Sequence, residues 1–146
     1  MKKIVKVVLN FGLFTSTIFG IWHFFVPYIY HWYDYIPNAP REIIVSIDWI
    51  NFFFSLFLAG SSFLLIIHQR EIELKKGIFS FFIFLVFIWF SRVIITLVHP
   101  WNQPYQFIDI IQFIIFLFVF ILLFIPLMYY LLNKKLKEPC QSHNSA

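Results

Sequence analysis

The chain has 146 residues, of which 61% are hydrophobic and 12% charged, and its formal net charge is +4 at pH 7. So few charged residues cannot cover a soluble domain of this size, which excludes a soluble enzyme and a soluble nucleic-acid-binding protein. The composition instead predicts an integral membrane protein whose excess positive charge lies beside anionic lipid.

Four long apolar segments make up most of the chain. They cover residues 4–26, 43–67, 78–98 and 107–132. Each is close to or longer than the ~20 residues that a helix needs to cross a bilayer. Because lipid cannot satisfy backbone N–H and C=O groups, each segment is predicted to be an α-helix. The short connections predict an all-α polytopic membrane protein, with a single four-transmembrane-helix bundle over residues 1–137 and a polar cytoplasmic tail over 138–146.

Lysine and arginine are distributed unevenly around these segments. Nine flank the N-terminus, the connection between the second and third segments, and the C-terminal end: Lys2, Lys3, Lys6, Arg70, Lys75, Lys76, Lys134, Lys135 and Lys137. The other two connections hold only Arg41. The positive-inside rule therefore predicts that both termini are cytoplasmic. The first segment also resembles a signal peptide, but it continues through Phe25 without a clear cleavage site, so we expect it to remain as an anchor.

Motifs of known enzyme classes are absent from the sequence. The single cysteine, Cys140, excludes an intrachain disulfide and a CxxC redox pair. No HExxH, GxSxG or P-loop pattern occurs. The sequence thus implies no particular cofactor and no metal site, and it favours a protein that is not an enzyme.

Small and polar residues recur every three or four positions along the first two predicted helices, so on each helix they share one face. They are Gly12, Ser16, Gly20 and His23 on the first helix, and Asp48, Asn51, Ser55, Ala59 and Ser62 on the second. Small residues allow close approach of helix backbones in lipid. We therefore expect the first three residues of the first face to pack against the last three of the second.

Ionisable residues within the predicted helices gather near one side of the membrane. With two amides at similar depth they form the candidate ligand-binding site: His23, Asp48, Asn51, Arg92, His99, Asp109 and Gln112. A charge in hydrocarbon costs several kcal/mol unless it is paired or hydrated, so such residues indicate a functional site. Arg92, about 9 Å from its helix end, is expected to pair with Asp48 or Asp109.

A purely structural interpretation of these residues is also open. One ion pair of Arg92 could hold the helices together, while His23 and His99 cap helix ends at the interface. The aromatic connections over residues 27–40 and 99–105 could form an interfacial belt, or they could roof a pocket.

The segment GIWHFFVPYIYHW, residues 20–32, follows a glycine-bearing first helix and precedes a second helix with a polar start. In this layout the chain resembles the small four-helix membrane proteins grouped with the DoxX-like families. The resemblance covers helix number, size and the region from His23 to Pro27. It implies a protein of the bacterial cytoplasmic (inner) membrane and does not fix an activity.

The leading functional hypothesis is a binding or accessory protein with an outward-facing pocket for a small amphipathic ligand, such as a lipid headgroup or a quinone-like ring. Arg92 would contact a ligand oxygen, Asp48 and Asp109 would balance its charge, and His23 or His99 would hydrogen-bond or exchange protons.

Three alternatives come from other functional classes. The first is a b-type haem or electron-transfer subunit with His23 and His99 as axial ligands. The second is a transporter, although the other half of the predicted membrane region lacks ionisable residues. The third is a structural or accessory subunit, bound to other copies of the chain or to a larger membrane complex.

Overall fold

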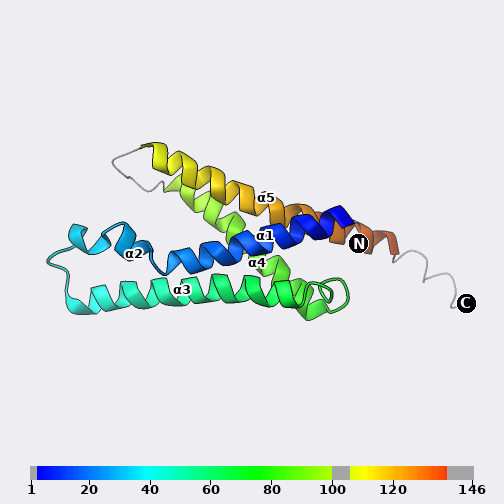
Figure 1. Cartoon of the computed structure of the whole chain (residues 1–146), viewed down its shortest axis with the longest axis horizontal. Coiled ribbons are helices and arrows are strands. Elements are labelled where there is room, and N and C mark those ends of the chain that lie inside the picture. The colour runs from blue at the N-terminus through cyan, green and yellow to red at the C-terminus, as the bar shows by residue number, and fades with distance from the viewer. Residues whose placement is uncertain (1–2, 100–105, 138–146) are drawn as a thin grey trace, which may run out of the picture. The chain divides into compact units, whose positions relative to one another are not determined.

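The computed structural model describes residues 3–99 and 106–137, and within these ranges every regular element is a helix (Figure 1). The elements are α1 (Lys3–His23), α2 (Val26–Ile29), the 3-10 helix η1 (Trp32–Tyr35), α3 (Arg41–Ile67), α4 (Lys76–Val98) and α5 (Gln106–Lys137). Four helices, α1, α3, α4 and the Ile110–Asn133 part of α5, are long and apolar enough to cross a membrane. The predicted all-α class with four spanning helices is confirmed, and the chain is an integral membrane protein.

The exposed surface of these helices is largely apolar. Phe14 on α1, Phe53 on α3 and Phe87 on α4 are 59%, 62% and 59% exposed. Exposed aromatic rings on successive helices would be a liability in water, whereas hydrocarbon solvates them. The apolar surface therefore fits a lipid environment.

The chain forms two compact units. One consists of Leu13–Ile67, which includes the second half of α1, α2, η1 and α3. The other contains the first half of α1 together with α4 and α5. The first unit forms within one continuous stretch of sequence.

Within Leu13–Ile67, α1 and α3 approach at backbone distance. A Cβ atom added to Gly20 would lie 2.4 Å from the backbone nitrogen of Ala59, too close for any side chain. Four residues earlier on α1, the hydroxyls of Ser16 and Ser62 form a buried hydrogen bond of 2.7 Å. The crossing predicted from the small residues is thus confirmed for Ser16 and Gly20.

Gly12 has a different neighbour, and its expected place against α3 is wrong. A Cβ atom added there would lie 3.0 Å from Leu123 Cδ2 and 3.1 Å from Leu122 Cβ, both on α5. The close approach occurs where Pro126, inside α5, lacks the N–H that would bond to the Leu122 carbonyl. The row of small residues on α1 therefore has two neighbours, α5 at Gly12 and α3 at Ser16 and Gly20.

Aromatic pairs join α4 to α5 in the other unit. The rings of Trp89 and Phe116 lie 6.0 Å apart at 61°, and those of Phe82 and Tyr130 lie 6.2 Å apart at 78°. All four side chains are buried. Such edge-to-face pairs contribute about 0.5–1.5 kcal/mol each beyond the apolar area that they bury.

Candidate functional site

The site is built where α1 ends. The sequence predicted a first helix up to Val26, but α1 ends at His23 and a short helix, α2, starts at Val26. In a continuous helix the ring of Pro27 would clash with the His23 carbonyl and could not donate to it. Phe24 and Phe25 instead close a tight turn, with their N–H groups donating to Ile21 and Trp22. The predicted end at Val26 is therefore wrong, because Pro27 stops the helix four residues earlier.

The side chain of Asn51 on α3 takes the place of the missing N–H. Its Nδ2 donates a hydrogen bond of 3.0 Å to the His23 carbonyl. Its Oδ1 lies 3.4 Å from His23 Nδ1. Because an amide oxygen can only accept, the His23 proton in this contact is on Nδ1. One buried amide thus fixes both the backbone and the imidazole of His23.

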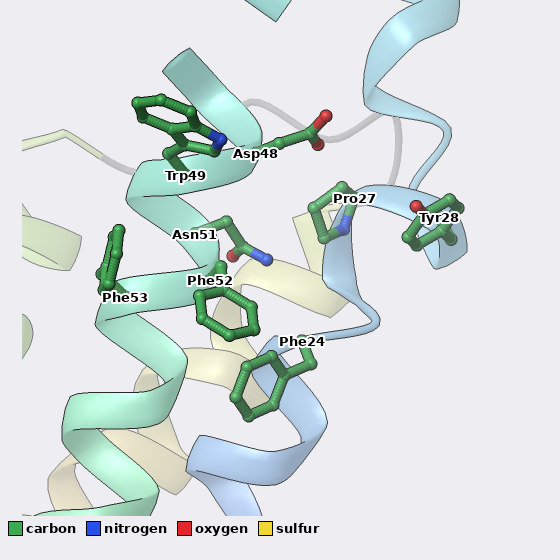
Figure 2. A pocket seen from close by; sticks show the side chains of 8 residues that line it. All are labelled: Phe24, Pro27, Tyr28, Asp48, Trp49, Asn51, Phe52 and Phe53. Atoms are coloured by element: carbon green, nitrogen blue, oxygen red, sulfur yellow. The ribbon is translucent and has the colours of Figure 1, made fainter. Parts of the chain in front are cut away.

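A pocket of about 610 Å³ opens beside this contact (Figure 2). Its lining comes from the turn after α1, from α2 and from the part of α3 between Asp48 and Phe53: Phe24, Pro27, Tyr28, Asp48, Trp49, Asn51, Phe52 and Phe53. In Figure 2 the Asp48 and Asn51 side chains extend from α3 toward the segment with Pro27, while Trp49 and Phe53 extend from the other side of α3. The pocket combines aromatic walls with two polar groups.

Aromatic contacts hold several of the lining rings in place. Phe24 and Phe52 meet edge to face with centroids 5.4 Å apart, and Phe52 and Phe53 do so at 5.6 Å. The His23 imidazole packs in the same way on Phe54, at 5.1 Å. These pairs connect the turn after α1 to α3 and give the pocket a defined wall.

Asp48 accepts a hydrogen bond from the hydroxyl of Tyr33 on η1. Partial burial, this hydrogen bond and the negative charge of Asp48 raise the pKa of Tyr33 to about 12. Burial and a nearby anion both disfavour the phenolate, so Tyr33 remains a donor at neutral pH. The bond ties η1 to α3 beside the pocket.

The chain reaches η1 through a strained residue. His31 has a φ of 50°, in the left-handed region that most side chains avoid. Its carbonyl accepts a hydrogen bond of 3.0 Å from the Asp34 N–H, which starts η1. This turn between α2 and η1 brings Tyr33 to Asp48.

The seven predicted site residues fall into two groups. His23, Asp48 and Asn51 lie in Leu13–Ile67, where His23 bonds to Asn51, and Asp48 and Asn51 line one pocket. Arg92, His99 and Gln112 lie in the other unit, and the side chain of Asp109 lies outside the described residues. Convergence of all seven, including an ion pair of Arg92, stays a prediction.

On α4, the Arg92 guanidinium lies over the Phe116 ring, with 4.3 Å from its carbon to the ring centroid. Thr96 donates a hydrogen bond of 2.8 Å to the Arg92 carbonyl. His99 follows the last turn of α4, is exposed and donates its backbone N–H to Ile95. A face-on aromatic ring stabilises the cation in an apolar setting.

From the sequence, Tyr28 and Tyr33 belong to an aromatic connection that could form an interfacial belt or roof a pocket, and the other aromatic lining residues were not predicted as part of the site. The signal for the lining was present, since Trp49, Phe52 and Phe53 flank the polar residues Asp48 and Asn51 on α3. The bond from Tyr33 had no such signal, because it depends on the backbone conformation of His31.

In the part of the chain that the structure describes, no group of three or more His, Cys, Asp or Glu side chains could hold a metal ion. No protein-family model, curated protein or solved structure matches this chain. The resemblance to DoxX-like families and the haem hypothesis for His23 and His99 therefore stay predictions. Evidence on function has to come from the site itself.

Proposed function

We propose that the protein binds a small amphipathic ligand in the pocket between the end of α1, α2 and the start of α3. The observation that carries the proposal is the lining itself, which combines the polar residues Asp48 and Asn51 with five aromatic residues. Ligand sites are typically apolar concavities of about 300–1,000 Å³ with a few polar groups that orient the ligand. At about 610 Å³ the pocket lies within this range.

The exposure of the lining supports a ligand that is part apolar and part polar. Trp49 is 66% exposed and Phe53 is 62% exposed, so both rings can be covered by a bound molecule. An acyl chain of the bilayer would cover these rings equally well, but it would offer no polar or charged group to the Asp48 carboxylate. A headgroup beside Asp48 accounts for both parts of the lining.

We also propose that the pocket faces outward from a bacterial inner membrane, with both termini in the cytoplasm. The support is the location of nine of the eleven Lys and Arg residues at the other ends of the spanning helices. Ligands of suitable class on that side include lipid headgroups and quinone-like molecules.

Native mass spectrometry of the protein in mild detergent tests the proposal. We expect the wild-type protein to carry a bound molecule that the pocket variant Trp49→Ala loses. The matched control is Trp22→Ala, because Trp22 is an exposed residue of α1 outside the pocket lining. Loss from both variants would contradict a ligand in this pocket, and so would an empty wild-type protein that also binds no added amphiphile. The same spectrum would reveal a haem or a protein partner, the two main alternatives from the sequence.

A further inference from the structure

We infer that the ligand of this pocket is a cationic amphiphile, with an ammonium group bound by the Asp48 carboxylate and its apolar part lying along the aromatic lining. The inference rests on the proposed function and names the ligand class. It follows from the charge of the lining, the charge around it, the state of Asp48 and the nature of the walls.

The pocket lining carries a single formal negative charge. Of the eight described lining residues, Asp48 is the one with a formal charge at pH 7. An anionic headgroup would meet this carboxylate without a lysine or arginine of the lining to compensate it. Bringing like charges together is unfavourable, whereas a cation gains from the same contact.

The compact unit that contains the pocket also has a negative formal charge. Leu13–Ile67 contains one basic residue, Arg41, and three acidic residues, Asp34, Glu42 and Asp48, for a formal charge of −2. The whole chain has a formal charge of +4. The pocket therefore lies in the one acidic part of a basic protein, which favours approach of cations over anions.

Asp48 is positioned but not saturated. Tyr33 donates to Oδ1 and so restricts the orientation of the carboxylate. An ionised carboxylate has about four acceptor positions on its two oxygens, so one neutral donor leaves room for an ammonium group. Because Tyr33 keeps its proton at neutral pH, it adds no second negative charge.

The walls suit a cation with an apolar body. Five of the eight lining residues are aromatic: Phe24, Tyr28, Trp49, Phe52 and Phe53. The faces of aromatic rings attract ammonium groups, and Trp and Tyr do so better than aliphatic side chains. The same rings give an alkyl chain an apolar surface. The ammonium group can thus contact Asp48 and the ring faces, and the alkyl chain can contact the same aromatic rings.

The test uses three small amphiphiles of equal chain length: hexyltrimethylammonium, hexanol and hexanoate. Each is titrated into the purified protein in a neutral maltoside detergent, and binding is followed by the change in tryptophan fluorescence that Trp49→Phe removes. We expect hexyltrimethylammonium to bind about tenfold more tightly than hexanol, and hexanoate to bind most weakly of the three. Equal affinity for all three in the wild-type protein would overturn the inference without any variant.

Variants then assign the preference to Asp48. Asp48→Asn keeps an acceptor for Tyr33 and should bring the affinity for the cation down to that for hexanol, while Asp48→Glu should retain a preference. The matched control is Asp34→Asn, which removes one exposed charge of η1 outside the lining and should leave the preference intact. An equal loss in Asp34→Asn would show a general field effect and overturn the assignment to Asp48.

The source of the ammonium group is read from native mass spectrometry. Retention of a lipid with an ammonium headgroup, displaced by hexyltrimethylammonium, identifies a lipid ligand. Empty protein that binds hexyltrimethylammonium identifies a free amphipathic amine, and both outcomes support the inference. Binding of hexanol as tight as that of the cation would refute the charge preference and leave the proposed function standing. No binding of any amphiphile, with no retained molecule, would refute the proposed function as well.

Discussion

The amide of Asn51 caps the carbonyl of His23 at the residue where Pro27 ends α1. The hydrogen bond is 3.0 Å long, and Asn51 is only 9% exposed. Removing this amide takes a hydrogen-bond donor away from a carbonyl in an apolar environment, which costs about 1–3 kcal/mol.

Replacement of Asn51 by alanine should therefore lower the free energy of unfolding by about 1–3 kcal/mol. Asn38→Ala, in the exposed connection before α3, should have little effect. Unfolding in mixed detergent micelles, followed by circular dichroism, measures both. The cost of Asn51→Ala should also shrink in a Pro27→Ala background, where an N–H is again present to bond to His23. A cost that is unchanged in that background would contradict the capping role.

The close contact between Gly20 and Ala59 can be tested by adding a single methyl group at Gly20. Gly20→Ala places a Cβ atom 2.4 Å from the Ala59 nitrogen, so α1 and α3 must separate. We expect a loss of about 1–3 kcal/mol in the same assay. Gly60→Ala is the matched control on α3, because a Cβ atom there meets nothing within 4 Å. Equal tolerance of the two substitutions would contradict the backbone contact.

The hydroxyl of Tyr33 should lose its proton at a higher pH than an ordinary tyrosine hydroxyl. Its pKa is raised from 10.0 to about 12, first by burial and then by Asp48. The difference between ultraviolet titrations of the wild-type protein and Tyr33→Phe isolates this group. In Asp48→Asn we expect the pKa to fall toward 10.0, but not all the way, because burial remains.

The raised pKa of Tyr33 determines how the free energy of unfolding changes with pH. The folded protein holds the Tyr33 proton more tightly than the unfolded chain does. The stabilisation is therefore fully present below pH 10 and is lost as the pH rises through about 12. A stability difference between wild type and Tyr33→Phe that does not decline over this interval would argue against the bond to Asp48.

Arg92 and Phe116 should be energetically coupled. The guanidinium lies 4.3 Å from the ring centroid, a distance at which cation–π attraction is about 0.5–2 kcal/mol. A double-mutant cycle with Arg92→Met and Phe116→Leu should return a coupling energy in this range. Arg92→Met with Phe118→Leu is the control, since Phe118 is an exposed ring on the same helix. Additive effects in the first cycle would mean that the ring does not stabilise the cation.

Topology can be measured with reporter fusions. If both termini are cytoplasmic, alkaline phosphatase fused after Lys137 should be inactive, and a fusion near Asn38 should be active. The reverse result would place the pocket on the cytoplasmic side, and the proposed source of the ligand would change with it.

The parts of the fold that follow from local chemistry could be predicted from the sequence. Four apolar segments gave the four spanning helices, and the small residues of α1 and α3 gave the crossing at Gly20. The early end of α1 was also within reach, because Pro27 lies four residues after His23 and a proline at that spacing excludes the helical bond.

Other parts depend on geometry that residue patterns do not contain. The face with Gly12, Ser16 and Gly20 looks uniform in sequence, yet Gly12 packs on α5 and Gly20 on α3. The pairing of His23 with Asn51 could be expected from two facing rows. The pairing of Asp48 with Tyr33 could not, because it requires the left-handed backbone of His31.

All the residues that line the pocket lie between Phe24 and Phe53. This stretch is continuous in the sequence and precedes α4 and α5. The capping bond of Asn51, the close approach at Gly20 and the bond from Tyr33 to Asp48 all lie within the same stretch of sequence, Leu13–Ile67. The residues proposed to contact the ligand, and the contacts that hold them, are therefore encoded in one continuous part of the chain that includes no residue of α4 or α5.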